Sequence, residues 1–298
     1  MQIKEMERLK IRGRVVAHQS MKELTSLRIG GQADLFVVPE GLEDLKTVIS
    51  FCRERRVSFL VIGNGSKLLI RDEGFKGVVV KLGTSFTRIE NEGEEITVGA
   101  GLDLSTLIDF VAEKGLRGLE LLAGIPGTVG GAITRNASAF GQDLGQRVIS
   151  VRALDNNNGD FTIPKKDILF GYRTSIFLRK RDWTITEVKL ALSPGKKEDV
   201  LSRLREARDK KMMTQPISLP SAGCVFKNPA SSSAGLLIQR AGCSGMRVGD
   251  AQVSIQHANF IINKGNATAR DTIRLIDMVR ERVKASSGIT LEPELEII

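Results

Sequence analysis

The stretch LAGIPGTVGGAITRNASAFG, residues 122–141, contains too many glycines for a regular strand. Where glycines cluster, no side chain keeps a ligand away from the backbone amides, and the pyrophosphate of a dinucleotide is an anion that such amides bind well. A second glycine loop, GNGS at residues 63–66, follows an apolar run at residues 58–62. For either loop alone, an ordinary turn is as good an interpretation as a ligand-binding loop. Their occurrence together favours a dinucleotide-binding fold.

The spacing of the glycines excludes two common nucleotide folds. Neither loop has the GxGxxG pattern opening a strand–helix unit, and no GxxxxGK[ST] is present. A Rossmann domain and a P-loop kinase are therefore disfavoured.

Short β-branched runs alternate with amphipathic patterns along the whole chain, which predicts a mixed α and β fold. Thr268 and Asp271 have the spacing of a capping box and introduce the last helix. The patterns predict helices over residues 42–52, 104–115, 200–211, 234–241 and from 268 onward, and strands over 58–62, 77–82, 94–99, 148–154, 184–192 and 289–298.

Length and composition indicate a water-soluble protein of two or three packed units. The chain has 298 residues, and no apolar run approaches the roughly 20 residues that a membrane span requires. The first fifteen residues are charged and lack the apolar core of a secretory signal, so a cytoplasmic location is expected. Ser193-Pro194-Gly195 is a plausible domain boundary.

The thiols and imidazoles predict no metal site and no disulfide. Cys52, Cys224 and Cys243 fit neither a disulfide framework nor a zinc pattern. His18 and His257 lie far apart in the sequence, without an HExxH motif.

The net charge of +9 raises the possibility of nucleic-acid binding, with residues 203–211 (RLREARDKK) as the densest basic segment. Val200, Leu204 and Ala207 recur there at helical spacing, which makes the basic residues the solvated face of an amphipathic helix. Aromatic residues make up 5% of the chain, so stacking platforms for single strands are few. A basic surface that attracts phosphorylated small molecules fits equally well, and neither nucleic acid nor a membrane is expected as a partner.

Five segments in order carry a specific resemblance that spans nearly the whole chain. With QVSIQHANFIIN and the terminal LEPELEII, the chain resembles the UDP-N-acetylenolpyruvoylglucosamine reductases. The five segments are TSLRIGGQADLFVVP (25–39), VIGNGSKLLI (61–70), LAGIPGTVGGAITRNASAFG (122–141), FGYRTSIF (170–177) and LPSAGCVFKNP (219–229).

The resemblance implies an α+β fold with a two-lobed FAD-binding domain of the vanillyl-alcohol-oxidase type. This domain would span residues 25–194, with its lobes divided near residue 82. An N-terminal segment over 1–24 would precede it, and a smaller α+β substrate-binding domain over 195–298 would follow. Neither glycine loop contains His or Cys, so non-covalent FAD is expected. The implied FAD-binding residues are Gly63, Asn64, Gly65, Ser66, Gly124, Ile125, Pro126, Gly127, Thr128, Gly130, Gly131 and Asn136.

The implied activity is that of an NADPH-dependent oxidoreductase of peptidoglycan synthesis. It reduces the enolpyruvyl ether of UDP-N-acetylglucosamine to UDP-N-acetylmuramate. Hydride passes from NADPH to the flavin and then to the terminal enolpyruvyl carbon, so the site needs a charge partner for the substrate carboxylate and a proton donor for the adjacent carbon. The resemblance assigns Arg173 to the carboxylate, Cys224 to proton donation and Glu294 to the developing enolate, in a protonated or shared-proton state. Glu292 would share a face with Glu294 in a regular strand and is the alternative.

The chain departs from the family pattern at three positions. Cys224 stands where serine is common, and a thiol is a better acid than an alcohol. Lys67 stands where the GNGSN pattern has asparagine, and Glu296 replaces a common arginine. Tyr172 is the only tyrosine and belongs to FGYRTSIF, so the chain resembles the shorter type of reductase, without a tyrosine-bearing loop over the substrate.

The resemblance places Tyr172, Lys227, Asn228 and His257 at the UDP-sugar, and the expected assembly is a monomer or weak oligomer. For His257, a structural role is an equally good interpretation. Two rival functions stay open at this point. One is another flavoenzyme of the same fold that passes electrons to oxygen, and the other is a basic nucleic-acid-binding protein that keeps the flavin fold as a scaffold.

Overall fold

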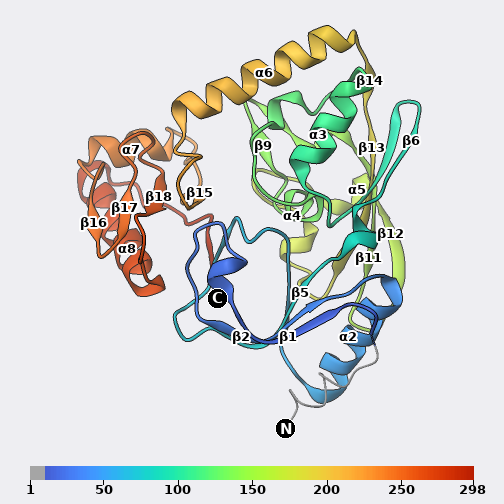
Figure 1. The fold of residues 1–298 in the computed structure, drawn as a ribbon. Coiled ribbons are helices and arrows are strands. Elements are labelled where there is room, and N and C mark those ends of the chain that lie inside the picture. The colour runs from blue at the N-terminus through green and yellow to red at the C-terminus, as the bar shows by residue number, and fades with distance from the viewer. Residues whose placement is uncertain (1–10) are drawn as a thin grey trace. The chain divides into compact units, whose positions relative to one another are not determined.

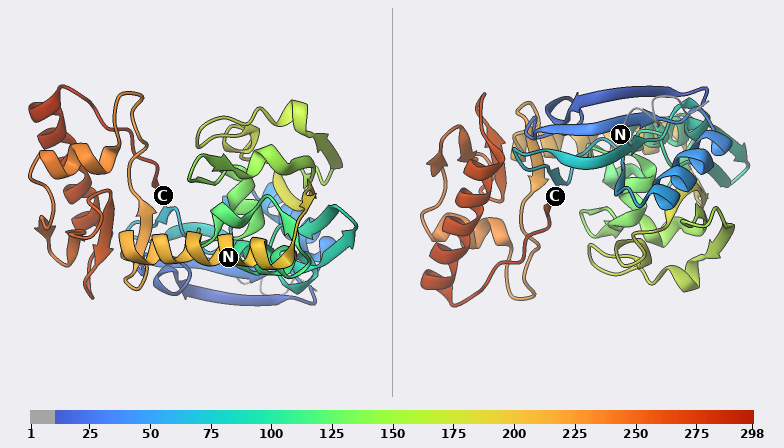
Figure 2. Two further views of the ribbon diagram at one scale, coloured as in Figure 1. Left: turned by 90° about the horizontal axis from the view of Figure 1, so that it is seen from above. Right: turned by 90° about the horizontal axis from the view of Figure 1, so that it is seen from below.

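A computed structural model describes residues 11–298, and this part of the chain divides into two compact units. The larger unit comprises residues 34–63 and 76–209 together with the N-terminal stretch that ends at His18. The smaller unit comprises Gln19–Ala33, Asn64–Phe75 and Lys210–Ile298. Each unit is described by itself, with the elements labelled in Figure 1 and seen from two further sides in Figure 2. Residues 1–10 of the predicted N-terminal segment lie outside the described residues.

One sheet has the strand order β1-β2-β5-β3. Its strands are β1 (Arg14–Ser20), β2 (Gln32–Val38), β5 (Phe75–Lys81) and β3 (Phe59–Ile62), and β3 pairs with β5 in parallel. Helix α2 (Leu42–Arg55) buries Leu45, Val48, Ile49 and Cys52, at the spacing that the sequence predicts. These side chains pack with Val78 and Val80 of β5 in one core.

The larger unit also contains a five-stranded antiparallel sheet, in the order β12-β11-β13-β7-β6. Its strands are β12 (Asp160–Pro164), β11 (Val148–Leu154), β13 (Thr184–Ala191), β7 (Glu95–Gly99) and β6 (Ile89–Glu92). Helices α3 (Leu104–Glu113) and α4 (Val129–Thr134) belong to the same core. Shorter elements complete this region: η2 (Thr84–Thr87), β8 (Leu116–Arg117), η3 (Glu120–Leu122), β9 (Ser138–Ala139), β10 (Gln142–Asp143), η4 (Leu144–Arg147), α5 (Lys165–Ile168), η5 (Ile176–Leu178) and β14 (Ser193–Pro194).

Helix α6 (Lys197–Thr214) carries the basic segment. Arg203, Arg205 and Lys210 are exposed, as the prediction of a solvated face requires, whereas Lys211 is buried and departs from it. Val200, Leu204 and Ala207 are buried in the core of the larger unit. Because of this packing, the larger unit extends to Asp209. The predicted domain boundary at residue 194 therefore differs from the division into compact units.

The smaller unit is built on a four-stranded sheet in the order β15-β18-β17-β16. The strands are β15 (Ser221–Cys224), β18 (Phe260–Asn263), β17 (Ala251–Val253) and β16 (Arg247–Val248), and α7 (Ala234–Arg240) and α8 (Ala269–Ser287) share their core. Thr268 and Asp271 form the predicted capping box at the start of α8, and Gly288 ends it in the left-handed conformation.

Two early segments join the smaller unit because backbone pairing holds them to its C-terminal part. Strand β19 (Glu296–Ile297) pairs in parallel with β4 (Leu68–Leu69), and the amide of Arg71 donates to the carbonyl of Ile298 at 2.8 Å. The Ser26 hydroxyl donates to the carbonyl of Ser221 at 2.7 Å. The first of these segments also contains η1 (Met21–Glu23).

The prediction of one long final strand over 289–298 is wrong, since only Glu296–Ile297 is a regular strand. Pro293 has no amide to donate to a ladder, and it lies in an isolated bridge with Phe226. The neighbouring amides supply the two hydrogen bonds of this bridge. Lys227 donates to the carbonyl of Glu292 at 2.9 Å, and Glu294 donates to that of Val225 at 2.7 Å.

Across residues 11–298, no helix is both long and apolar enough to cross a membrane. In the same part of the chain, no group of three or more His, Cys, Asp or Glu side chains is arranged to hold a metal ion.

Candidate active site

In the larger unit, Gly63, the first residue of the loop GNGS, lies against the second predicted glycine loop. A Cβ atom added to Gly63 would lie 2.3 Å from Oγ1 of Thr128, so only glycine fits at that point of the first loop. Thr128 is the N-cap of α4, and its hydroxyl accepts a hydrogen bond from the amide of Gly131 at 3.3 Å. The backbone of Gly63 therefore approaches the start of α4 closely.

The second loop is fixed by backbone hydrogen bonds on its protein side. The amide of Leu104 donates to the carbonyl of Gly127 at 2.9 Å, and the amide of Val129 donates to the carbonyl of Leu102 at 2.8 Å. Gly127 has φ +131°, a conformation that residues with a side chain rarely adopt. Within residues 11–298, no backbone carbonyl accepts from the amides of Gly124, Gly127 or Thr128. A rigid loop that presents such donors fits the pyrophosphate of a dinucleotide.

Asn136, predicted at the cofactor, is buried with φ +44°, and its amide is used within the protein. Its Nδ2 donates to the carbonyl of Gly171 at 3.0 Å, and its Oδ1 accepts from the amide of Gly145 at 2.9 Å. Ser175 adds a second link, since its hydroxyl donates to the carbonyl of Thr134 at 2.7 Å. The glycine-rich segment thus anchors FGYRTSIF.

Arg173 lies in a tight turn whose ends, Gly171 and Thr174, exchange backbone hydrogen bonds of 3.0 and 3.2 Å. Its φ is +55°, which is uncommon for a residue with a side chain and points to a constrained position. Nη1 donates to Ser138 at both the carbonyl (3.2 Å) and the hydroxyl (3.0 Å), and the guanidinium lies 5.7 Å from the ring centroid of the exposed Tyr172. Sequence reasoning missed Ser138, although it belongs to the 122–141 motif.

In the smaller unit, Cys224 and Glu294 are brought together by Lys67. The ammonium donates to the carbonyl of Cys224 at 2.6 Å and lies 3.1 Å from Oε1 of Glu294. Glu294 is buried, whereas Glu292 is exposed and pairs with Lys227. The two glutamates flank Pro293, which forms an isolated bridge with Phe226, and differ in exposure. The geometry favours Glu294 over Glu292 as the companion of Cys224.

Asn259 holds the residues directly after β15 in place, a role that no sequence pattern indicates. It is buried, its Nδ2 donates to the carbonyl of Phe226, and its Oδ1 accepts from the amide of the same residue, both at 2.9 Å. Its own carbonyl accepts from the amide of Val225 at 2.8 Å. The side chain and the backbone of Asn259 therefore hold Val225 and Phe226, directly after Cys224, in place.

The three thiols differ in accessibility. Cys224 is half-buried, whereas Cys52 and Cys243 are buried. Burial raises the pKa of Cys52 to about 12 and raises that of Cys243 as well. Both buried thiols are therefore protonated and poorly nucleophilic at neutral pH.

Three of the residues predicted at the UDP-sugar, Lys227, Asn228 and His257, lie in the smaller unit and have partners there. The ammonium of Lys227 lies 2.6 Å from Oε1 of Glu292, and Asn228 Oδ1 accepts from the amide of Ala234 at the start of α7. His257 packs edge-on against Phe260 with 4.8 Å between ring centroids, and its Nδ1 accepts from the amide of Asn259 at 3.3 Å. These contacts orient the three side chains, but they do not identify a ligand.

We expect the smaller unit to lose stability below pH 6.5 in part through His257. Desolvation lowers the pKa of His257, so the unfolded chain takes up its proton first as the pH falls. The contribution is full above the unfolded pKa of about 6.5 and decreases toward the lower folded pKa. Denaturant unfolding at pH 7.5 and 5.5 measures the loss, which should be smaller in His257→Gln. An equal loss in both proteins would contradict the expectation, and between pH 7.5 and 8.5 the two should not diverge.

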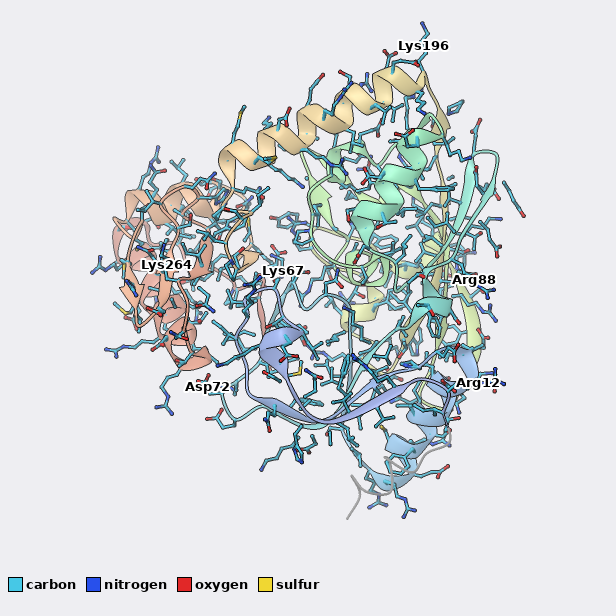
Figure 3. All side chains as sticks on the ribbon, in the orientation of Figure 1. Arg12, Lys67, Asp72, Arg88, Lys196 and Lys264 are labelled. Atoms are coloured by element: carbon cyan, nitrogen blue, oxygen red, sulfur yellow. The ribbon has the colours of Figure 1, made fainter. Side chains whose placement is uncertain are left out.

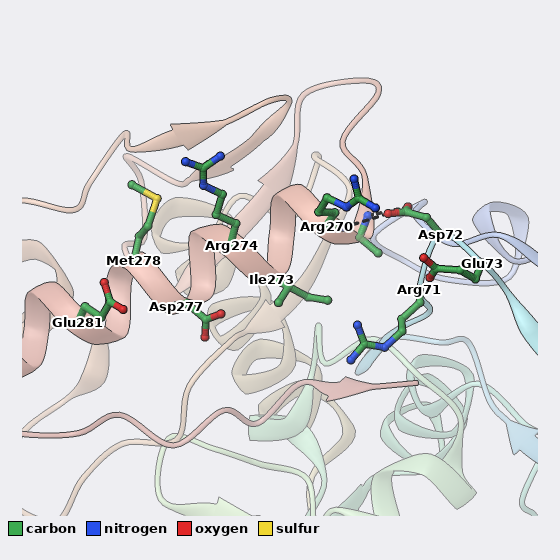
Figure 4. Close-up of a pocket in the computed structure, with 10 residues that line it drawn as sticks. Arg71, Asp72, Glu73, Arg270, Ile273, Arg274, Asp277, Met278 and Glu281 are labelled. Carbon is green, nitrogen blue, oxygen red and sulfur yellow. Dashed lines mark hydrogen bonds between the residues drawn. The ribbon is translucent and has the colours of Figure 1, made fainter.

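A groove of about 510 Å³ lies elsewhere on the smaller unit, between α8 and residues 71–73 (Figure 4). Asp72 accepts hydrogen bonds there from the amides of Ala269 (2.8 Å) and Arg270 (3.1 Å) at the start of α8. The lining mixes three arginines with four carboxylates and contains none of the predicted site residues. The groove therefore adds nothing to the candidate site.

The class of the protein follows from the fold and the glycine loops together with family models. A model described as FAD binding domain matches residues 33–162, and the C-terminal domain of UDP-N-acetylenolpyruvoylglucosamine reductase matches residues 215–298. The chain is thus an α+β flavoprotein of the vanillyl-alcohol-oxidase type with a smaller C-terminal α+β domain, which confirms the predicted fold class.

Whole-chain comparisons identify the family. The UDP-N-acetylenolpyruvoylglucosamine reductase of Alkaliphilus oremlandii (strain OhILAs) is 40% identical over 287 residues, which cover 95% of this chain and 93% of the relative. That of Bacillus subtilis (strain 168) is 38% identical over 286 residues, 96% and 94% of the two chains. The crystal structure of the reductase from Thermus caldophilus matches with a TM-score of 0.83 at 36% identity, covering 96% of this chain and 99% of the other. The chain belongs to the UDP-N-acetylenolpyruvoylglucosamine reductase family.

Proposed function

We propose that this chain reduces the enolpyruvyl ether of UDP-N-acetylglucosamine to UDP-N-acetylmuramate with NADPH, in the synthesis of peptidoglycan precursors. The observation that carries the proposal is family membership along almost the whole chain, since the matched relatives are named as reductases of this substrate. We place the activity in the cytoplasm, where both nucleotides are available, and in a monomer or weak oligomer.

FAD, bound without a covalent link, supplies a carrier that takes hydride from NADPH and gives it to the substrate. Backbone amides of the glycine loops would hold its pyrophosphate, because the fixed loop at Gly127 and Thr128 leaves these donors without a carbonyl partner within residues 11–298. The residues proposed at the cofactor are Gly63, Asn64, Gly65, Ser66, Gly124, Ile125, Pro126, Gly127, Thr128, Gly130 and Gly131. Asn136 acts beside them by supporting the Arg173 turn.

Arg173 would bind the substrate carboxylate. Its guanidinium fork suits a planar carboxylate, and the strained turn together with Ser138 holds the side chain before substrate arrives. Negative charge develops next to that carboxylate when hydride adds to the terminal carbon. A cation that is already oriented stabilises this charge without reorganising during the reaction.

Cys224 would give its proton to the carbon beside the carboxylate. Hydride on one carbon and this proton on the other complete the reduction of the double bond, and a thiolate stays on Cys224 until solvent reprotonates it. Glu294, buried near the same residue, would act on the developing enolate. Lys227 would exchange its exposed partner Glu292 for a phosphate of the UDP group.

Tyr172, Asn228 and His257 would complete the UDP-sugar site. Tyr172 is exposed beside Arg173, so its ring can contact the substrate from the same turn. Asn228 and His257 are held by Ala234 and Asn259, which presets their orientation.

A visible absorption spectrum tests the function as a whole. The purified protein should be yellow, NADPH should bleach it, and the enolpyruvyl substrate should restore the colour without oxygen. Fast reoxidation by oxygen with no response to the enolpyruvyl substrate would favour an oxidase. A colourless protein that binds nucleic acid in a salt-sensitive way would contradict the flavoenzyme proposal altogether.

We expect Gly131→Ala to weaken FAD binding without harming the fold. An added Cβ would meet only Oγ1 of Thr128 at 3.5 Å, an ordinary contact, and alanine is the better helix former by about 0.5–1 kcal/mol. A ligand backed closely against Gly131 would meet the methyl group, and overpacking of this kind costs about 1–3 kcal/mol, or roughly tenfold in affinity. Flavin retention and thermal unfolding of the apoprotein are the two measurements.

Gly41→Ala is the matched control for this prediction. Gly41 precedes α2 in the same unit, and its added Cβ would lie 3.7 Å from Oγ of Ser85. This variant should keep its flavin. Wild-type flavin affinity in Gly131→Ala would show that the cofactor does not approach this glycine. Gly65→Val is a poor probe by comparison, because its Cβ would lie 2.3 Å from the carbonyl oxygen of Leu24 and disturb the fold itself.

A further inference from the structure

Lys67 is the point at which two departures from the family pattern meet. It follows the loop GNGS, where the family pattern has asparagine, and its ammonium donates to the carbonyl of Cys224 at 2.6 Å. The same ammonium lies 3.1 Å from Oε1 of Glu294. One side chain, labelled in Figure 3, therefore binds both the backbone of the proposed proton donor and the proposed enolate partner.

The burial of Glu294 makes this contact more than a surface ion pair. The side chain of Glu294 is 3% exposed, and that of Lys67 is 23% exposed. A carboxyl group this deeply buried needs polar partners, and removing its partner is destabilising. Asparagine is neutral and shorter, so it could not supply the charge.

The backbone around the ammonium is arranged to accommodate it. Gly223, directly before Cys224, has φ +68°, and a Cβ there would lie 3.3 Å from Nζ of Lys67. The carbonyl of Lys67 accepts from the amide of Glu296 at 3.0 Å, and the amide of Glu294 donates to the carbonyl of Val225 at 2.7 Å. Lys67, the 223–225 segment and the 294–296 segment are therefore linked by both backbone and side chain.

We propose that Lys67 is a positioning residue, which holds the thiol of Cys224 and the carboxylate of Glu294 in one fixed arrangement for protonation of the substrate. The proposal rests on the proposed function. Its ammonium binds the carbonyl of Cys224 and so places a positive charge at the backbone of the proton donor. Lys67 itself exchanges no proton with the substrate.

The test compares Lys67→Met and Lys67→Arg with wild type in three measurements. Recolouring of the reduced protein by saturating substrate should slow at least tenfold in Lys67→Met, while bleaching by NADPH stays within about twofold. The rate at which Cys224 is alkylated, measured by mass spectrometry of its peptide, should change several-fold. The reason is that the backbone of Cys224 loses its hydrogen bond to Lys67. In Lys67→Arg, recolouring and alkylation should both lie between those of Lys67→Met and wild type, since arginine keeps the charge.

Arg247→Met is the matched control for the loss of a cation. Arg247, in the same unit, also binds one carboxylate, that of Asp250, and one carbonyl, that of Gly249, but on the surface. It should leave all three measurements at the wild-type values. If Lys67→Met does not fold, the double variant Lys67→Met/Glu294→Gln removes the unpaired buried charge. This double variant should fold, with a thermal midpoint nearer to that of wild type. Its Cys224 should still be alkylated at a rate different from that of the wild-type protein.

Two outcomes overturn the proposal. Wild-type recolouring and alkylation in Lys67→Met would show that Lys67 positions neither group. Equal loss of bleaching and recolouring, with lowered flavin content, would assign Lys67 to the cofactor or the fold. Failure of the proposed function gives a different result, because wild-type protein would then not recolour with the enolpyruvyl substrate, whereas the alkylation of Cys224 would still respond to Lys67.

Discussion

Arg173→Ala is expected to slow the substrate-driven recolouring of the reduced protein by about 10²- to 10³-fold, the usual loss on removing a preorganised charge-stabilising group. Bleaching by NADPH should be much less affected, because Arg173 acts on the substrate carboxylate. The side chain is held in place by Ser138 and by a turn with φ +55°, so its loss removes an oriented cation. Stopped-flow absorbance of each half-reaction measures the two effects separately.

Three further variants make this prediction specific. Arg179→Ala removes an exposed arginine two residues after the FGYRTSIF segment and should be neutral in both half-reactions. Arg173→Lys should fall between wild type and alanine, since it keeps the charge but loses the fork. Ser138→Ala should cost less than Arg173→Ala because the carbonyl of Ser138 remains as an acceptor. Equal losses of bleaching and recolouring in Arg173→Ala would indicate a general structural defect instead.

The elements that the sequence predicts well are those with local signals. The apolar spacing of residues 42–52 predicts α2, the β-branched run at 148–154 predicts β11, and Thr268 with Asp271 predicts the start of α8. Each signal acts over one or two turns of helix or a single strand. No distant contact is needed to interpret it.

The division into units depended on contacts that leave no local signal. Residues 64–75 contain a short strand, β4, whose partner is β19 at the other end of the chain. Gly63 groups with the larger unit and Asn64 with the smaller one, although both belong to one glycine motif. A two-residue parallel pairing has no periodicity that a sequence pattern could display.

The candidate site shows the same limit. The resemblance supplied Arg173, Cys224 and Glu294, whereas the residues that hold them, Ser138 and Asn259, act on distant backbone groups. The sequence shows Lys67 only as a departure from the family pattern. The structure explains the need for its charge, because the buried Glu294 lies 3.1 Å away. The sequence pattern also did not indicate that Glu294 is buried, whereas Glu292 is exposed and pairs with Lys227.

Cys224→Ala is expected to lose about 10²- to 10⁴-fold in recolouring by substrate, the usual contribution of a positioned acid. Cys224→Ser should retain substantial turnover, because a hydroxyl in the same place can still donate a proton. Both variants should bleach normally with NADPH, since hydride transfer to the cofactor does not need this proton. The contrast between alanine and serine separates loss of the donor from loss of packing.

Thiol alkylation gives an independent measurement of the same residue. Cys224 is half-buried, while burial raises the pKa of Cys52 to about 12 and also raises that of Cys243, so alkylation at neutral pH should fall on Cys224. Alkylation should therefore inactivate wild-type protein, substrate should protect it, and Cys224→Ser should resist. Cys243→Ser is the control, and it should be inactivated like wild type. If Cys224→Ala recolours at the wild-type rate, the proton comes from another group, and the assignment of Cys224 is wrong.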